Sequence, residues 1–451
     1  MRTLADLRTA IRRANYIDEN AAVRALLAEC DLSMQQRQRI MAHARDLVQG
    51  CRKRSADRSL LDLFLQAFGL SSEEGIAMMC VAEALLRIPD ERTAEELIAD
   101  KLGSGNWTER TGTSDSLFVN ASTWALMLTG SVISLGQDVT DDAAGWIRGL
   151  VGRLGENVAR AALVQAMRIL GNEFVLGRNI DEALERETGI SSFDMLGEAA
   201  RTWDDADRYL QSYLGAIDAI AATHKRASTP SNPIDNSGIS VKLSALHPRF
   251  ELAKRALLNQ ELAPRVKQIA MQASAAGIHL TLDAEELERI DPTLDVFDAL
   301  ARDPDLEGWK GLGMVVQAYA KNSTALIDWI SALAGATNRD FMIRLVKGAY
   351  WDAEIKRSQV LGLPEYPVFT RKASTDLSYL VCAQKILAQS ERVYPQFATH
   401  NAHTIAAIVE MAEASRYEFQ RLHGMGLLLY DEAHKQHLTQ ALARVYAPVG
   451  E

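Results

Sequence analysis

Eight short runs of β-forming residues alternate with helical segments from about residue 190 to the end of the chain. The expected strands are residues 192–196, 239–243, 279–283, 314–318, 342–346, 396–399, 418–422 and 444–447. Helical patterns fill most of the gaps, for example residues 199–223, 287–300, 376–390 and 402–414. Eight βα units with polar residues at the strand ends favour an α/β fold of the (β/α)8 barrel type over an open sheet.

The part of the chain ahead of these units has a helical pattern. Val23, Leu26, Leu27 and Cys30 are expected to share one buried face of a helix that starts near Asp18. We therefore expect a helical arm and α-domain at 1–115, a linker with docking helices at 116–188, and the barrel at 189–451. The eighth strand is followed only by residues 448–451, so the last barrel helix is expected to be missing, the barrel to be distorted, and the face near 444–449 to be uncovered.

The composition limits the possible partners. The net charge of −10 argues against a general binder of nucleic acid or anionic membranes. The four cysteines form no CxxC pair, which favours a reducing cytosol and no zinc site. No signal-peptide core and no membrane-spanning apolar run is found, so we expect a cytoplasmic location.

Residues 341–351 combine a buried strand with two cations and two aromatic side chains. Arg344 and Lys347 lie at the carboxyl end of the strand, followed by Tyr350 and Trp351. Buried cations are costly unless each meets an anion or a ligand. Gly348 and its neighbour Ala349 allow a flat ligand to approach the backbone. This pattern favours a site for an anionic, planar ligand over a structural salt bridge alone.

Chemistry in (β/α)8 barrels takes place at the carboxyl ends of the strands. In chain order, the candidate residues there are Asp194, Lys242, Ser244, His247, Asp283, Glu285, Glu286, Gln317, Tyr319, Arg344, Lys347, Tyr350, Trp351, Thr399, His400, Asn401, Leu422, His423 and Tyr446.

Three classes of reaction are compatible with these residues. A metal-dependent hydrolase would use His247, His400 and His423, together with His403, but no HExxH motif is present and cations crowd the rim. A Schiff-base aldolase would need a desolvated lysine, whereas nearby carboxylates would keep Lys242 protonated. A flavin enzyme needs cations near the cofactor and an amide for its pyrimidine edge, which this set offers.

Several residues also have a purely structural interpretation. Lys242 and Asp283 could form no more than a buried ion pair. Glu285 and Glu286 are expected to cap the helix that follows the third strand. His279 is expected at the surface, at the start of a strand. His434 and His437 are expected to be solvated on a polar helix.

Dispersed motifs resemble the proline dehydrogenase domain of proline utilization A. They begin near Tyr16 in the arm and at Ser116, and the barrel carries most of them. The barrel motifs are ISVKLSALHP at 239–248, LDAEE at 282–286, RLVKGAYWD at 344–352, YPVFTRK at 366–372, QFATHNAH at 396–403, EFQRLHGMG at 418–426 and YAPVG at 446–450.

The resemblance implies a flavin enzyme that uses FAD to oxidise L-proline to Δ1-pyrroline-5-carboxylate and passes electrons to a membrane quinone. It implies that Lys242, Asp283, Arg344 and Tyr350 are catalytic, and that Leu422 and Tyr446 line the substrate pocket with Lys242 and Tyr350. The implied FAD contacts are Ala284, Gln317, Arg344, Lys347, Gly348, Ala349, Trp351, Thr370, Thr399, His400 and Asn401. No metal ligand is implied.

The resemblance also sets expectations about partners. Some family members carry a DNA-binding ribbon-helix-helix segment, and this chain is expected to lack it and to bind no nucleic acid. The family's aldehyde dehydrogenase domain is expected to be absent from these residues. The last helix of the family's barrel carries paired arginines that bind the proline carboxylate, so activity is expected to be impaired without it. A peripheral location at the inner membrane is expected during quinone reduction. An inactive binding or scaffold fragment is the non-enzymatic alternative.

Overall fold

The computed structural model describes residues 2–54, 174–227, 232–412 and 415–450. Its contacts divide the chain into two compact units, Met1–Ser55 with Gly177–Glu451, and Ala56–Leu176. Nearly all of the second unit lies outside the described residues, as do the docking helices expected at 116–188 up to residue 173. The domain boundaries at 115/116 and 188/189 therefore stay predictions, although residues 1–55 group with the barrel.

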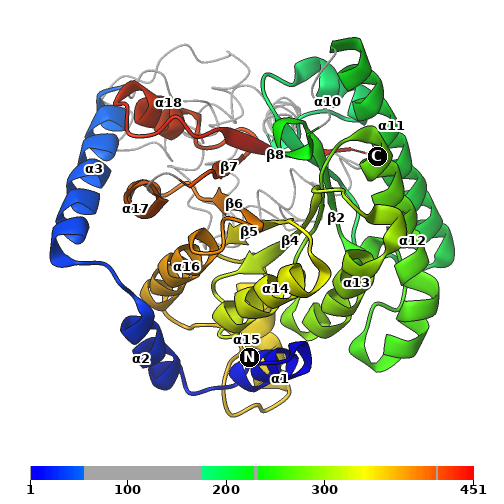
Figure 1. The fold of residues 1–451 in the computed structure, drawn as a ribbon, viewed down its shortest axis with the longest axis horizontal. Coiled ribbons are helices and arrows are strands. Elements are labelled where there is room, and N and C mark those ends of the chain that lie inside the picture. Colours follow the sequence, from blue (N-terminus) through cyan, green and yellow to red (C-terminus); the bar gives the residue numbers. More distant parts are fainter. Residues whose placement is uncertain (1, 55–173, 228–231, 413–414, 451) are drawn as a thin grey trace, which may run out of the picture. The chain divides into compact units, whose positions relative to one another are not determined.

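Eight parallel strands close into a barrel in sequence order, with β8 paired to β1. The strands are β1 Ser191–Met195, β2 Gly238–Val241, β3 Leu280–Leu282, β4 Leu312–Gln317, β5 Phe341–Val346, β6 Val393–Ala398, β7 Glu418–Leu422 and β8 Ala443–Val449. Each overlaps one of the eight predicted strands. Figure 1 shows them at the centre of the ring of helices. The predicted (β/α)8 fold is confirmed.

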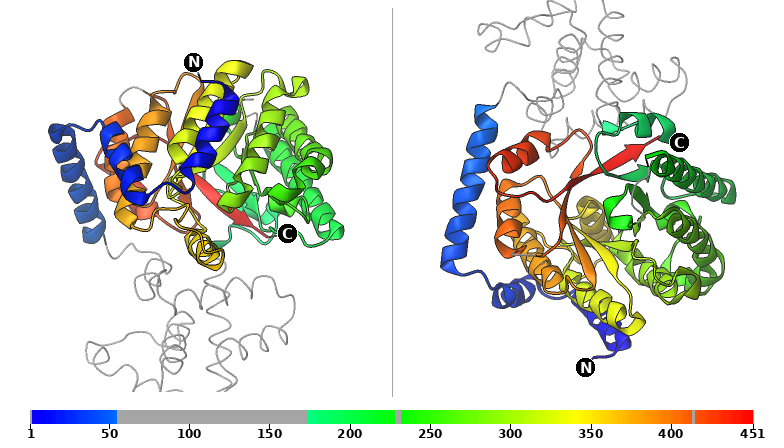
Figure 2. Two further views of the ribbon diagram at one scale, coloured as in Figure 1. Left: turned by 90° about the horizontal axis from the view of Figure 1, so that it is seen from below. Right: turned by 45° about the horizontal axis from the view of Figure 1, so that its top comes forward.

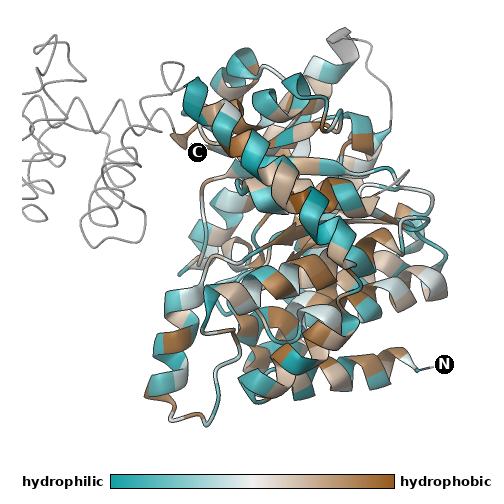
Figure 3. Cartoon of the chain, turned by 90° about the vertical axis from the view of Figure 1, so that its left-hand side faces the viewer, coloured by the Kyte–Doolittle hydropathy of each residue, from teal (hydrophilic) through white to brown (hydrophobic). Residues whose placement is uncertain are grey.

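Helices surround the strands and are mostly amphipathic, with hydrophilic and hydrophobic residues alternating along them (Figure 3). Those after β1 are α11 Trp203–Ala227, α12 Arg255–Ala276, α13 Ile290–Arg302, α14 Ser323–Thr337, α15 Trp351–Val360, α16 Lys372–Leu387, α17 Ala402–Ala412 and α18 Leu427–Lys435. α11, α13, α16 and α17 correspond to the four predicted helices. A short helix, α10 Ile180–Arg186, precedes β1.

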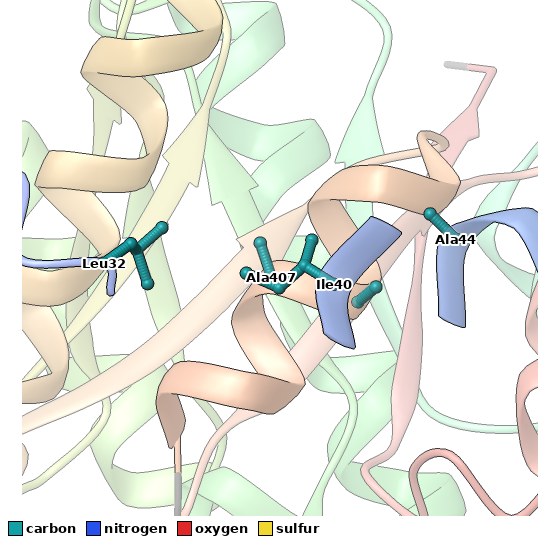
Figure 4. Packing of buried hydrophobic residues seen from close by; sticks show 5 residues of the cluster. Leu32, Ile40, Ala44 and Ala407 are labelled. Carbon is teal, nitrogen blue, oxygen red and sulfur yellow. The ribbon is translucent and has the colours of Figure 1, made fainter. Parts of the chain in front are cut away.

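The N-terminal arm comprises α1 Leu4–Ala14, α2 Glu19–Glu29 and α3 Met34–Lys53, which follow the outside of the barrel helices (Figures 1 and 2). Asp18 caps α2, as the sequence predicts, by accepting a hydrogen bond from the amide of Ala21. Figure 4 shows α3 presenting Ile40 and Ala44 to Ala407 of α17. Burial of this apolar face, rather than helix propensity alone, stabilises the arm on the barrel.

A buried ion pair between Arg444 and Glu418 lies at the amino end of the barrel, where the parallel strands begin. Both side chains are completely inaccessible to solvent. Arg444 Nε lies 2.7 Å from Glu418 Oε1, and its other nitrogens donate to the carbonyl oxygens of Asn236 and Ile234. The expectation of an uncovered face near 444–449 is wrong: no residue of β8 is exposed. Gly177 forms a bridge to Val449 and accounts for part of this cover.

His279 is also placed differently from the prediction. It is completely buried rather than at the surface, and its Nε2 lies 3.3 Å from Ser192 Oγ. Its ring packs so closely on Gly238 that a Cβ there would lie 2.3 Å from Nδ1. The side chain of the residue just before β3 therefore points into the barrel, where the missing side chain of Gly238 leaves room for the imidazole ring. His437 is exposed as expected, whereas His434 is partly buried with Nε2 3.2 Å from the carbonyl oxygen of Ala441.

Candidate active site

Five side chains, three from strand ends and two from strand interiors, form a connected network inside the carboxyl end of the barrel. Asp194 lies in β1, Lys242 directly follows β2, and Asp283 directly follows β3. Arg344 lies in the middle of β5 and Tyr446 in β8. Parallel strands bring these ends to one side of the barrel, so residues up to 252 positions apart in the chain meet there.

Lys242 is held by two carboxylates. Its Nζ lies 2.7 and 2.8 Å from the two carboxylate oxygens of Asp194 and 3.5 Å from Oδ2 of Asp283. The hydroxyl of Tyr446 lies 3.5 Å from the same Nζ and donates to Asp283 Oδ2 at 2.8 Å. The buried Lys242–Asp283 pair considered from the sequence is therefore present, but Asp194 is the closer partner.

Arg344 is the most deeply buried cation of this network, with a side chain that is 3% exposed. Its Nη1 donates to Asp283 Oδ1 at 2.9 Å, and its Nη2 donates to the hydroxyls of Ser192 and Ser240 at 2.8 and 3.0 Å. The guanidinium carbon lies 5.0 Å from the centre of the Tyr446 ring. Asp283 thus accepts from Arg344, Tyr446 and Lys242 together, which suits it to hold cations rather than to accept a further proton.

Burial and charge act in opposite directions on the ionisable groups here. Burial raises the pKa of Asp194, although the Lys242 ammonium opposes this shift. Burial alone would lower the pKa of Lys242, but Tyr446, Asp194 and Asp283 more than offset it, so its pKa lies well above the usual value. A lysine that stays protonated cannot be the free amine that Schiff-base chemistry requires.

The turn between β5 and α15 carries the aromatic pair. Tyr350 caps the start of α15, and Trp351 Nε1 donates to the carbonyl oxygen of Phe369 at 2.9 Å. Gly348 has φ +135°, and a Cβ there would lie 2.5 Å from the Tyr319 ring. Only glycine fits this position without strain or displacement of Tyr319, because the backbone here packs against that ring. The approach of a flat ligand to this turn stays a prediction.

The other residues of the proposed cofactor set lie around the same rim. Lys347 and Lys372 both contact the carboxylate of Asp376. Gln317 donates from Nε2 to the carbonyl oxygen of Glu285 at 2.9 Å. The amide and hydroxyl of Thr370 bond to the carboxylate of Glu19 in the arm, with the hydroxyl at 2.7 Å.

The ends of β6 and β7 meet through His400. Its Nε2 accepts from the amide of Leu422 at 3.0 Å, and burial lowers the pKa of His400 to about 4. The backbone amide of Asn401 donates to Thr399 Oγ1, and Asn401 Oδ1 accepts from the amide of Thr404 at the start of α17. A neutral imidazole therefore contacts the backbone of Leu422, which is 43% exposed.

Two of the structural interpretations of acidic residues need correction. Glu285 accepts from the amide of Ser244 at 3.0 Å and from Arg289 at 2.9 Å, so it connects two strand ends rather than capping a helix. Glu286 occupies the cap position of the short 3-10 helix Leu287–Arg289 without a side-chain cap hydrogen bond. The actual anion for the amide of Leu287 is Glu354, on α15.

The candidate metal ligands have other partners. His247 Nε2 lies 2.9 Å from Glu261, and His400 is engaged by Leu422. Among the described residues, no group of three or more His, Cys, Asp or Glu side chains is placed to hold a metal ion. Within the same residues, no helix has the length and hydrophobicity needed to cross a bilayer.

Sequence reasoning gave no role to Asp194, Ser192, Ser240 or Glu354. Asp194 was visible as a strand-end carboxylate, but its partner Lys242 is 48 positions away. The two serines could have been recognised as small polar residues on otherwise apolar strands. Glu354 carries no local signal, because its partner is a backbone amide in a distant loop.

A closed parallel barrel with a buried charge network at its carboxyl end defines an enzyme-type (β/α)8 barrel. The model of the proline dehydrogenase family matches residues 178–451, and the chain belongs to this family. The family resemblance seen in the motifs is thereby confirmed. A model of the proline utilization A proline dehydrogenase N-terminal domain matches residues 5–52. A model described as the DNA-binding domain of proline dehydrogenase matches residues 60–174, and the expected lack of nucleic-acid binding stays a prediction.

Curated relatives include the bifunctional protein PutA of Escherichia coli strain K12, which is 44% identical over 459 residues. These residues cover 98% of this chain and 34% of that protein. The Rhizobium meliloti PutA is 44% identical over 460 residues and covers 100% and 36%. A crystal structure of a Bradyrhizobium japonicum proline utilization A mutant has 47% identity and a TM-score of 0.73, covering 96% of this chain and 43% of that one. The chain thus spans about a third of the curated relatives' length.

Proposed function

We propose that this chain oxidises L-proline to Δ1-pyrroline-5-carboxylate with FAD and passes the electrons to a quinone. The observation that carries the proposal is the buried network of Lys242, Arg344, Asp283 and Tyr446 inside the carboxyl end of the barrel. Membership of the proline dehydrogenase family supports the substrate. The carboxyl-end position of the network supports a catalytic rather than a structural role.

Lys242 is the proposed partner of the substrate carboxylate. Its ammonium is fixed by Asp194, is 15% exposed at the side chain, and remains charged because three acidic or phenolic groups surround it. A carboxylate ligand gains a charge-assisted hydrogen bond there. Tyr350, Leu422 and the ring of Tyr446 are the proposed walls that orient the proline ring and exclude water.

The residues at the rim fit a flavin. The exposed Ala349 leaves the backbone accessible beside Trp351, which is 39% exposed, whereas Gly348 packs against the Tyr319 ring. Arg344 Nε has no hydrogen-bond partner among the described residues, so one donor of the buried guanidinium is unassigned. Lys347 and Lys372 provide positive charge for a pyrophosphate. The other proposed contacts are Ala284, Gln317, Thr370, Thr399, His400 and Asn401.

The reaction breaks one C5–H bond of proline, whose hydrogen leaves as a hydride, and one N–H bond, whose proton passes to solvent, because the product contains a C=N bond between the ring nitrogen and C5. A bound flavin supplies the two-electron acceptor for the hydride. The protein's own residues hold the carboxylate at Lys242, fix the Arg344 guanidinium through its hydrogen bond to Asp283, and place the ring against Tyr446. Asp283 accepts hydrogen bonds from Arg344, Tyr446 and Lys242, so we assign it to positioning these two cations and Tyr446.

The direct test is product analysis. The purified chain, supplied with FAD, L-proline and a soluble quinone analogue, should form pyrroline-5-carboxylate, which o-aminobenzaldehyde traps as a coloured adduct. D-proline serves as the stereochemical control and should give little product. Absence of product together with FAD that binds normally would favour the scaffold alternative. Stoichiometric bound zinc and failure to bind FAD would favour the metal-dependent hydrolase.

A further inference from the structure

Glu354 is a buried carboxylate that is not part of the network around Lys242 and Arg344. It is on α15, follows Tyr350 and Trp351 closely in sequence, and is only 3% exposed. Its Oε1 accepts a hydrogen bond from the amide of Leu287 at 2.6 Å. Leu287 begins the short 3-10 helix after β3, so this buried bond joins the connection after β3 to the helix after β5, beside the more exposed ion pair of Glu288 with Arg357.

The loop that Glu354 contacts is the one that follows Asp283. This loop is fixed on its other side by Glu285, whose carboxylate accepts from the amide of Ser244 at 3.0 Å. The carbonyl oxygen of Glu285 accepts from Gln317 at 2.9 Å. The loop is therefore hydrogen-bonded to the ends of β2 and β4, and the bond from the Leu287 amide to Glu354 connects it to α15.

α15 in turn carries the aromatic pair of the proposed site. The amide of Glu354 donates to the carbonyl oxygen of Tyr350 at 3.0 Å, within the first turn of the helix. The Leu287 side chain packs in a cluster with Tyr319, and Ile355 of α15 packs against the same cluster. A movement of the Leu287 backbone relative to α15 would thus alter the distance between Asp283 and Tyr350.

Among the described residues Glu354 forms no ion pair. Burial raises its pKa, the Leu287 amide opposes this shift, Glu286 and Glu288 add to it, and the charge of Arg357 lowers the pKa slightly against the effect of burial. A carboxylate buried with one backbone donor is costlier than an apolar side chain of similar size. We therefore expect Glu354 to fix the relative position of the loop and α15 rather than to raise the free energy of unfolding.

We propose that Glu354 is a positioning residue that holds the loop carrying Asp283 at a fixed distance from the turn carrying Tyr350 and Trp351. The effect on catalysis rests on the proposed oxidation of proline, while the structural coupling between the two segments does not.

The variants separate the hydrogen bond from charge and bulk. Glu354→Gln retains an acceptor oxygen at the same reach, Glu354→Leu retains bulk without an acceptor, and Glu354→Asp retains charge but is too short. Glu288→Leu is the matched control, because Glu288 pairs with Arg357 between the same two elements but is 41% exposed at the side chain. Glu354→Asp keeps the test available if Glu354→Leu does not fold.

Two readouts are measured on each variant of the full chain. The first is kcat/KM for proline per mole of bound flavin, which removes effects of partial unfolding. We expect Glu354→Leu and Glu354→Asp to fall by about tenfold or more, the scale of a small misplacement of a reacting group, and Glu354→Gln to stay within about threefold. The second is amide hydrogen exchange at residues 284–289 and 348–352, which should accelerate in both segments for Leu and Asp only.

The outcomes are distinguishable. Wild-type kcat/KM and exchange in Glu354→Leu or Glu354→Asp would overturn the proposal. An equal loss in Glu354→Gln would also overturn it, because the acceptor would then not be the operative feature. A loss of the same size in Glu288→Leu would assign the effect to general stability. If the unaltered chain oxidises no proline, the proposed function fails, and the exchange data alone decide whether Glu354 couples the two segments.

Discussion

The ammonium of Lys242 lies 2.7 and 2.8 Å from the two oxygens of Asp194, so the proposed substrate cation is already paired. Arg344 is likewise paired with Asp283 at 2.9 Å. The two cations and two carboxylates balance one another, which allows this much charge to be buried. A substrate carboxylate must therefore share Lys242 with Asp194 instead of meeting a free ammonium.

Replacing Lys242 should weaken the binding of proline-like carboxylates. Lys242→Ala removes a charge-assisted contact worth about 1.5–3 kcal/mol, which is about tenfold to a hundredfold in Kd. The measurement is a titration of the flavin spectrum with a ring carboxylate that lacks the amine. Lys310→Ala is the control, because Lys310 pairs with Asp340 at an exposed position. Equal affinity in Lys242→Ala and the unaltered chain would refute the carboxylate assignment.

The ion pair between Arg444 and Glu418, at the amino end of the barrel, should matter for the stability of the fold and not for ligand specificity. Glu418→Ala leaves the completely buried Arg444 without its counterion, so we expect a loss of about 3–5 kcal/mol in the free energy of unfolding. Urea denaturation measures this. Glu410→Ala, which breaks the more exposed pair with Arg39 in the arm, should cost less than about 1 kcal/mol. Similar losses in the two variants would show that burial does not set the cost.

His279 should make the fold sensitive to acid. Burial, with the charges of Arg444 and Arg344, lowers its pKa well below the usual value. The unfolded chain therefore binds a proton that the folded chain does not, so stability is full above about pH 6.5 and declines as pH falls below it, by up to about 1.4 kcal/mol per pH unit. His279→Asn should lose less stability than the unaltered chain between pH 7 and pH 5 in urea titrations.

The control for this measurement is His437→Asn, at an exposed position with φ +54° that asparagine tolerates. It should leave the pH dependence of unfolding unchanged. An identical decline with pH in His279→Asn and the unaltered chain would mean that His279 is not the group that takes up the proton.

The sequence was sufficient for the fold because the eight apolar runs each have a strong local pattern. The strand at 418–422 was predicted with its observed ends, and Asp18 was predicted as a helix start. His279 was misplaced because hydropathy alone puts a histidine at the surface, whereas Gly238 leaves room for its ring inside the barrel.

The site was predictable only where strand order brings residues together. Lys242, Asp283 and Arg344 follow from the rule that parallel strands share a carboxyl end. The contacts of Glu354 with Leu287 and of Glu19 with Thr370 span 67 and 351 positions and depend on how helices pack outside the barrel. No local periodicity encodes such distances, so the structure was needed to find them.

The measurement that tests the central claim most directly is the visible absorption spectrum of the purified chain, loaded with FAD and mixed with L-proline in the absence of oxygen. The account predicts that the protein binds FAD in about equimolar amount, that proline bleaches the flavin band, and that Lys242→Ala slows this bleaching. A protein that retains no flavin, or whose bound flavin stays oxidised with excess proline but is reduced by dithionite, would contradict the account.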